Sequence, residues 1–80
     1  MSDIQRLFTA ADIKIPLAKL EAAVPLRLQG IDSLDMANLL FQLEQSSGNP
    51  ISPEQSTQLG TLGAIVRYID DAKARGAWTE

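Results

Sequence analysis

The sequence contains no cysteine and no histidine. Without cysteine, neither disulfide bonds nor thiolate metal sites can hold the chain together. Without histidine, the chain lacks the commonest general base and the commonest zinc ligand. We therefore expect no metal site, and we expect a single domain over residues 1–80 whose small hydrophobic core must stabilise it unaided.

Clusters of basic residues and long apolar runs are also missing. The net charge is −3, and the acidic residues are spread from Asp3 to Glu80. Nucleic-acid binding is not expected, because it needs clustered Lys and Arg to neutralise phosphates. No apolar run approaches the roughly 20 residues that span a bilayer, and Met1-Ser2-Asp3 lacks the features of a signal peptide. The expected location is cytoplasmic, with no membrane span.

The hydrophobic pattern predicts an all-α fold with no strand. It indicates a small four-helix bundle, with three main helices and one short helix. Ser52 and Pro53 mark the start of the short helix as its cap and its first residue, and Gly60 limits it to about two turns. The helices are expected at about residues 3–11, 33–47, 53–59 and 61–75, with a tail at 76–80.

The connection between the first two helices, residues 12–30, shows no sustained period. Pro16 disfavours helix at Ile15. The segment nevertheless carries many aliphatic side chains, among them Ile13, Ile15, Leu20, Val24, Leu26 and Leu28. We therefore expect a long structured loop that packs on the helices, with a short turn at residues 17–21, and not a flexible linker.

The helix expected at 33–47 has two apolar faces when it is wound at 3.6 residues per turn. The face expected toward the core consists of Met36, Leu39, Leu40 and Leu43. A polar wedge separates it from a second apolar stripe, formed by Leu34, Ala37 and Phe41. The second stripe is expected to face solvent or a partner.

Ser33 is prominent at the start of this helix, between Asp32 and Asp35. The first turn of a helix leaves backbone N–H groups unpaired and carries the positive end of the helix dipole, so a phosphate ester would be well placed there. Self-contained catalysis is not expected, because no histidine or nearby lysine could activate Ser33. Asp32 and Asp35 could instead help to hold a divalent cation while another enzyme transfers a phosphoryl group to Ser33.

The stretch Gly30-Ile31-Asp32-Ser33-Leu34-Asp35 resembles the Asp-Ser-Leu attachment motif of acyl carrier proteins. The resemblance extends to the order of the helices and to the segment Thr61-Leu62-Gly63-Ala64-Ile65-Val66-Arg67-Tyr68-Ile69. It implies that a phosphopantetheinyl transferase attaches 4′-phosphopantetheine to Ser33, with Asp32 and Asp35 assisting. The arm would carry acyl, aminoacyl or related intermediates as thioesters. The implied partners are a loading ligase or transferase and downstream biosynthetic enzymes, and the chain is expected to be a monomer.

The same resemblance implies further roles for the long helix. A partner-docking surface would be formed by Leu34, Ala37, Asn38 and Phe41. A cargo pocket would be lined by Met36, Leu40, Leu43 and Leu59, although these four side chains could equally be simple core. Because Asn38 is neutral where carriers of fatty acid synthesis are often acidic, we expect a specialised carrier and not a housekeeping one. The alternative is a helical protein-interaction module in which Asp32 or Ser33 only caps a helix.

Overall fold

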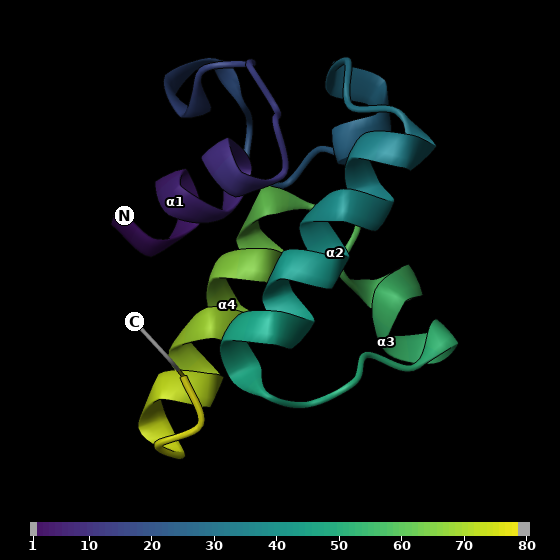
Figure 1. Cartoon of the computed structure of the whole chain (residues 1–80). Helices are drawn as coiled ribbons and strands as arrows, with labels where there is room; N and C mark the ends of the chain where they lie inside the picture. Colours follow the sequence, from purple (N-terminus) through teal and green to yellow (C-terminus); the bar gives the residue numbers. More distant parts are fainter. Residues whose placement is uncertain (1, 79–80) are drawn as a thin grey trace.

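The computed structural model describes residues 2–78, which form four α-helices and two short 3-10 helices (Figure 1). The α-helices are α1 (Ser2–Ala10), α2 (Ser33–Ser47), α3 (Pro53–Gln58) and α4 (Leu62–Ala74). This part of the chain has no strand, only an isolated bridge between Pro25 and Thr61. The prediction of a small all-α fold is confirmed. Residues 79–80 of the expected tail, and Met1, lie outside the described residues.

Local sequence signals set the helix ends. The Ser52 hydroxyl accepts a hydrogen bond from the Gln55 N–H, and the Gln55 side chain accepts one from the Ser52 N–H, so α3 begins with a capping box. Gly48 ends α2 with a φ of 72°, which glycine adopts without strain. α1 ends one residue earlier than expected, and Asp12 then adopts a left-handed conformation with a φ of 61°.

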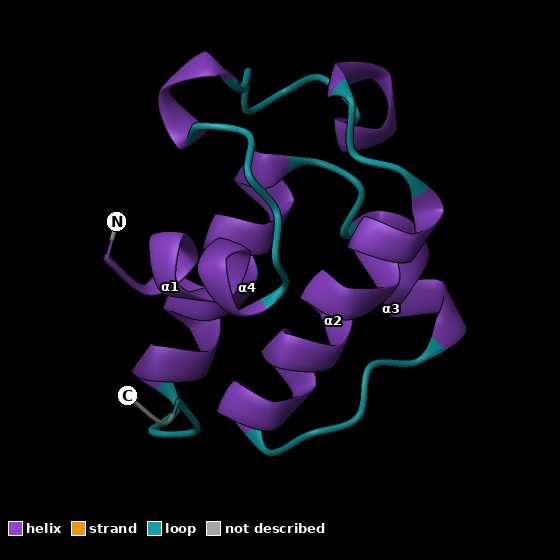
Figure 2. Cartoon of the chain, turned by 45° about the horizontal axis from the view of Figure 1, so that its top comes forward, coloured by secondary structure: helices purple, strands orange, loops and turns teal. Residues whose placement is uncertain are grey.

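One hydrophobic core joins α1, α2, α4 and the long loop. Figure 1 shows α2 and α4 side by side, and in both views α3 lies on the side of α2 away from α1 (Figure 1, Figure 2). The largest side chains that are fully buried come from α1, α2, α4 and the long loop, and none of them comes from α3. They are Phe8, Leu26, Ile31, Leu39, Leu43 and Ile65. Because two of these six side chains belong to the loop, the loop is part of the core and not a covering laid over it.

The long loop contains two 3-10 helices, η1 (Leu17–Lys19) and η2 (Leu26–Gln29). The first falls within the turn expected at residues 17–21, whereas the second was not predicted. The loop packs on the helices as expected through Ile13, Leu26 and Ile31, which are all buried. Leu28 is the exception among the large aliphatic side chains of the loop, because 67% of its surface is exposed.

Polar contacts fix the shape of this loop. The Gln29 side chain accepts a hydrogen bond from the Glu21 N–H at 2.8 Å and donates to the carbonyls of Glu21 and Val24. The Leu26 N–H donates to the Gly60 carbonyl at 2.8 Å, which joins η2 to the connection between α3 and α4. These bonds pair backbone groups that an irregular loop would otherwise leave without a protein partner. They also hold the segment before Ser33 in one conformation.

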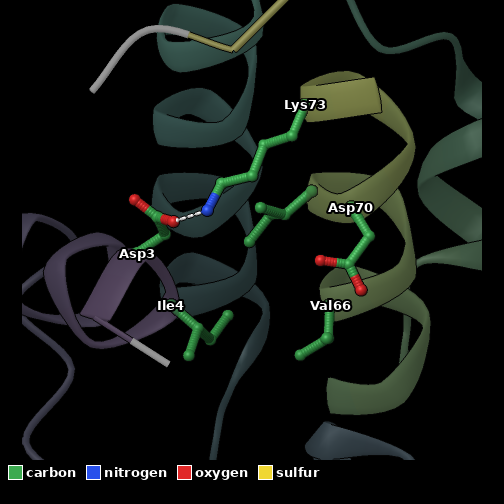
Figure 3. Close-up of a pocket in the computed structure, with 6 residues that line it drawn as sticks. Asp3, Ile4, Val66, Asp70 and Lys73 are labelled. Atoms are coloured by element: carbon green, nitrogen blue, oxygen red, sulfur yellow. Dashed lines mark ion pairs between the residues drawn. The ribbon is translucent and has the colours of Figure 1, made fainter. Parts of the chain in front are cut away.

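An ion pair connects α1 to the C-terminal half of α4. The Asp3 carboxylate lies between Lys73 of α4 and Arg6 of its own helix, and Figure 3 shows Lys73 reaching across to it. The Asp3 side chain is only 9% exposed. The hydrogen bond from Lys73 lowers the pKa of Asp3 despite this burial, and the Trp78 indole and Arg6 lower it further.

Candidate functional site

Ser33 is the first residue of α2, and its side chain is exposed. The residues on either side are held in place. Ile31 is fully buried, and the Asp32 carboxylate accepts a hydrogen bond from the Asp35 N–H at 2.8 Å. Among residues 2–78 the Ser33 hydroxyl itself has no hydrogen-bond partner. The fold therefore presents a free hydroxyl on a turn that the buried Ile31 and the Asp32 cap hold in place.

The structure separates the roles of two neighbouring residues. Asp32 caps α2, with an extended backbone and a side chain that bonds to the first turn. Ser33 lies inside the helix and takes no part in the cap. The alternative interpretation expected Asp32 or Ser33 only to cap the helix, and the structure assigns the cap to Asp32 and not to Ser33.

The start of α2 suits a negatively charged group. The Asp35 and Met36 N–H groups both donate to Asp32, the first to its side chain and the second to its carbonyl at 3.0 Å. Those of Ser33 and Leu34 have no partner within residues 2–78. Unpaired N–H groups and the helix dipole together stabilise an anion at this end of a 15-residue helix.

An open groove runs from Ser33 between α2 and α3, with a volume of about 360 Å³. We call it the α2–α3 groove. It is lined by Arg27, Asp32, Ser33, Met36, Ala37, Leu40, Ser56 and Thr57. A second groove of similar size adjoins it and shares Arg27, Met36 and Thr57. Each groove has a volume of about 360 Å³, which is within the range of pockets that accept small organic ligands, about 300–1,000 Å³.

The structure divides the four residues expected to line a cargo pocket. Met36 and Leu40 are half-buried and line the α2–α3 groove. Leu43 is 0% exposed and Leu59 is 5% exposed, and both belong to the hydrophobic core. Neither Leu43 nor Leu59 lines the groove beside Ser33, so the structure brings together only two of the four.

Three groove residues were missed by the sequence analysis: Arg27, Ser56 and Thr57. Ser56 and Thr57 lie on a helix too short for a periodic signal. Arg27 belongs to η2, whose conformation depends on the distant Gly60 carbonyl. The sequence shows only that Arg27 precedes Ser33 by six residues, and this spacing by itself does not indicate that the two residues line the same groove.

The residues expected to dock partners form one exposed face of α2. Leu34 is 68% exposed and Phe41 is 54% exposed, and Ala37 and Asn38 lie between them on the same side of the helix. Exposed large apolar side chains are individually common, and a pair on one helix face is compatible with a contact surface. Their docking role remains a prediction.

Residues 2–78 contain no group of three or more acidic, cysteine or histidine side chains placed to hold a metal ion. In the same part of the chain, none of the helices has the length and apolar character needed to cross a bilayer.

Comparison with known proteins gives the family. A family model described as "Phosphopantetheine attachment site" matches residues 3–69, most of the chain. The chain therefore belongs to the family of proteins with a phosphopantetheine attachment site, and the resemblance seen in the sequence is confirmed. The family defines its cofactor as covalently attached 4′-phosphopantetheine.

Curated relatives agree with this assignment. An "Acyl carrier protein" of Helicobacter pylori (strain G27) and one of Helicobacter acinonychis (strain Sheeba) are each 41% identical to this chain over 44 residues. The match covers 55% of this chain and 56% of each relative, so it spans about half their length. No solved structure gives a significant match.

The residues at the start of α2 fit this cofactor. A phosphodiester needs an accessible hydroxyl, and Ser33 offers one that makes no competing hydrogen bond within the described residues. The free N–H groups of the first turn suit the phosphate charge. The α2–α3 groove offers a surface along which an arm of small-molecule size can lie.

Proposed function

We propose that Ser33 is the residue to which the arm is attached, and that the chain is an acyl carrier. One observation carries this proposal: within the segment that matches the family, the exposed Ser33 hydroxyl lies unbonded at the start of α2. When bound, the arm supplies a thiol that holds an acyl, aminoacyl or related group as a thioester. Catalysis belongs to the partner enzymes, and this chain is a carrier and not a catalyst.

Each neighbouring residue has a task in this proposal. Ile31 anchors the turn in the core, and the Asp32 cap fixes the direction in which α2 begins. Asp35 is half-buried in the first turn of the same helix, and with Asp32 it assists the transferase by holding the divalent cation during modification. Met36 and Leu40 provide an apolar surface for the arm or its cargo.

The exposed face of α2 is the proposed docking surface. Leu34 and Phe41 supply apolar contact area, and Ala37 and Asn38 lie between them. The partners are a phosphopantetheinyl transferase, a loading ligase or transferase, and downstream biosynthetic enzymes. Because modification consumes coenzyme A, we place the chain in the cytoplasm. We also propose that it is a monomer, which meets each partner in turn.

Intact-mass measurement tests the attachment. The purified chain is incubated with coenzyme A, Mg²⁺ and a broad-specificity phosphopantetheinyl transferase. The wild-type chain should gain the mass of one phosphopantetheine, and Ser33→Ala should gain nothing. Ser56→Ala is the matched control, because Ser56 lines the same groove and should not affect the modification. No gain in the wild type, or a gain that survives Ser33→Ala, would contradict the proposal.

A further inference from the structure

Arg27 is the cation of the groove beside Ser33. It lies in η2, lines the α2–α3 groove together with Ser33, and also lines the adjoining groove. Among the residues that line these two grooves, it is the only basic one. Its side chain is exposed and makes no ion pair or hydrogen bond with the rest of residues 2–78. The guanidinium is therefore available to a ligand.

The backbone that carries Arg27 is held firmly. Its neighbour Leu26 is fully buried, and the Leu26 N–H donates to the Gly60 carbonyl at 2.8 Å. Gly30 then ends η2 in a left-handed conformation, with a φ of 94°, shortly before Ser33. On the protein side, only the Arg27 side chain needs to order on binding, which limits the protein's share of the entropy cost of the contact.

Negative charge accumulates around Ser33 when the arm is attached. Attachment of the arm adds a phosphodiester with one negative charge at Ser33, beside the carboxylates of Asp32 and Asp35. Asp32 lines the same groove as Arg27. Three negative charges would then gather at the start of α2, with Arg27 as the one cation lining the groove. The guanidinium is always charged and matches two phosphate oxygens at once.

We propose that Arg27 binds the phosphodiester that joins the arm to Ser33. This contact directs the first part of the arm into the α2–α3 groove, over Met36 and Leu40, and away from free solvent. The inference rests on the proposed attachment at Ser33. It concerns the resting carrier, and it makes Arg27 a positioning residue for the arm before any partner enzyme is bound.

The test uses chains in which intact mass shows complete attachment of the arm. NMR spectra of the unmodified and modified chain are compared for the Arg Nε–Hε signals, and the ³¹P signal of the modified chain is recorded. The Arg27 Nε–Hε signal should shift on attachment, and the Arg67 signal should not. Arg67 is the matched control because it is exposed and lines neither groove.

Variants complete the experiment. Arg27→Gln should shift the ³¹P signal relative to the wild type, Arg67→Gln should leave it unchanged, and Arg27→Lys should restore part of the contact. In about 1 M salt, where the Debye length is about 3 Å, the shift of the Arg27 signal should shrink. Because Arg27 is exposed, Arg27→Gln is expected to fold, and an unchanged helical circular dichroism spectrum checks this.

Three results would overturn the inference. If the wild type gains no mass, the attachment itself is contradicted, and the Arg27 contact falls with it. If the arm is fully attached but the Arg27 and ³¹P signals do not respond, only the contact is contradicted. If Arg27→Gln slows attachment while the spectra of its modified form match the wild type, Arg27 binds the transferase and not the arm.

Discussion

Asp32 and Ser33 are adjacent residues with separate physical roles. The Asp32 carboxylate bonds to the Asp35 N–H and satisfies one of the unpaired donors of α2. The Ser33 hydroxyl makes no hydrogen bond within residues 2–78, so the folded state does not depend on it. A chain that keeps a free hydroxyl beside an efficient cap can have that hydroxyl modified with little loss of stability.

This separation predicts different stability effects for the two residues. Asp32→Ala should lower the free energy of unfolding by about 1 kcal/mol, because the Asp35 N–H loses its partner. Ser33→Ala should change it by less than about 0.5 kcal/mol, as for an exposed side chain without contacts. Urea denaturation of the unmodified chains measures both. If Ser33→Ala proved as destabilising as Asp32→Ala, Ser33 would have a structural role that its geometry does not suggest.

At the scale of the element, α2 presents three surfaces. Leu39 and Leu43 are fully buried, Met36 and Leu40 are half-buried at the α2–α3 groove, and Leu34 and Phe41 are mostly exposed. A helix with a single apolar stripe would serve only to pack the core. A helix with this division can hold the core together and still offer surfaces to a cofactor arm and to partners.

The first two surfaces should respond differently to truncation. Leu43→Ala removes a 0% exposed side chain from the core and should cost about 2–5 kcal/mol of unfolding free energy. Leu40→Ala should cost less, because the groove side of Leu40 already faces open space. Urea denaturation of the two variants under the same conditions makes the comparison. Equal losses of unfolding free energy would show that Leu40 packs as a core residue and does not face the groove.

The third surface should matter for partners and not for the fold. Phe41→Ala should leave the unfolding free energy nearly unchanged, because the side chain is 54% exposed, while weakening transfer to or from a cognate enzyme. Leu28→Ala serves as the matched control, since Leu28 is a similarly exposed apolar residue outside α2. Stability and transfer rate are measured on the same preparations. Marked unfolding, or an equal loss of transfer in Leu28→Ala, would contradict a docking role specific to α2.

At the scale of the whole molecule, Asp3 connects the two ends of the described chain. Its carboxylate meets Lys73 of α4 and Arg6 of α1, and Trp78 of the tail contributes to the same environment. Asp70 also faces this region, since it lines the small depression between α1 and α4 (Figure 3). The bundle is thus joined by a charged contact at an edge of its apolar core.

This contact predicts a pH-dependent stability. The folded chain lowers the pKa of Asp3 below its ordinary value of 3.8, so the stabilisation is present above that value. It is lost as the pH falls through the lower pKa of the folded state. Asp3→Asn should therefore be less stable than the wild type at about pH 7 and should approach it near pH 2.

Urea denaturation at both pH values measures the effect. Glu21→Gln is a suitable control, because Glu21 is an exposed acid on the long loop that does not line this depression, and it should show no comparable dependence. A stability difference between Asp3→Asn and wild type that stays constant from neutral to acidic pH would show that the Asp3 charge is not responsible.

Much of this fold could be predicted from local patterns. Apolar spacing at three and four residues places α1 and α4, and Ser52, Pro53 and Gly48 mark helix ends through backbone preferences that act within a few residues. These signals are short-range, so a single sequence contains them. η2 is different, because its conformation depends on a hydrogen bond from Leu26 to the carbonyl of Gly60, which is distant in the sequence.

The candidate site divides in the same way. The sequence by itself determined that a serine flanked by carboxylates opens a helix, since capping and helix dipoles are local properties. Only the tertiary structure decided that Leu43 and Leu59 belong to the core, and that Met36, Leu40, Arg27 and Thr57 share the groove beside Ser33. That groove lies where η2, α2 and α3 meet. Its composition depends on long-range packing, which no local pattern records.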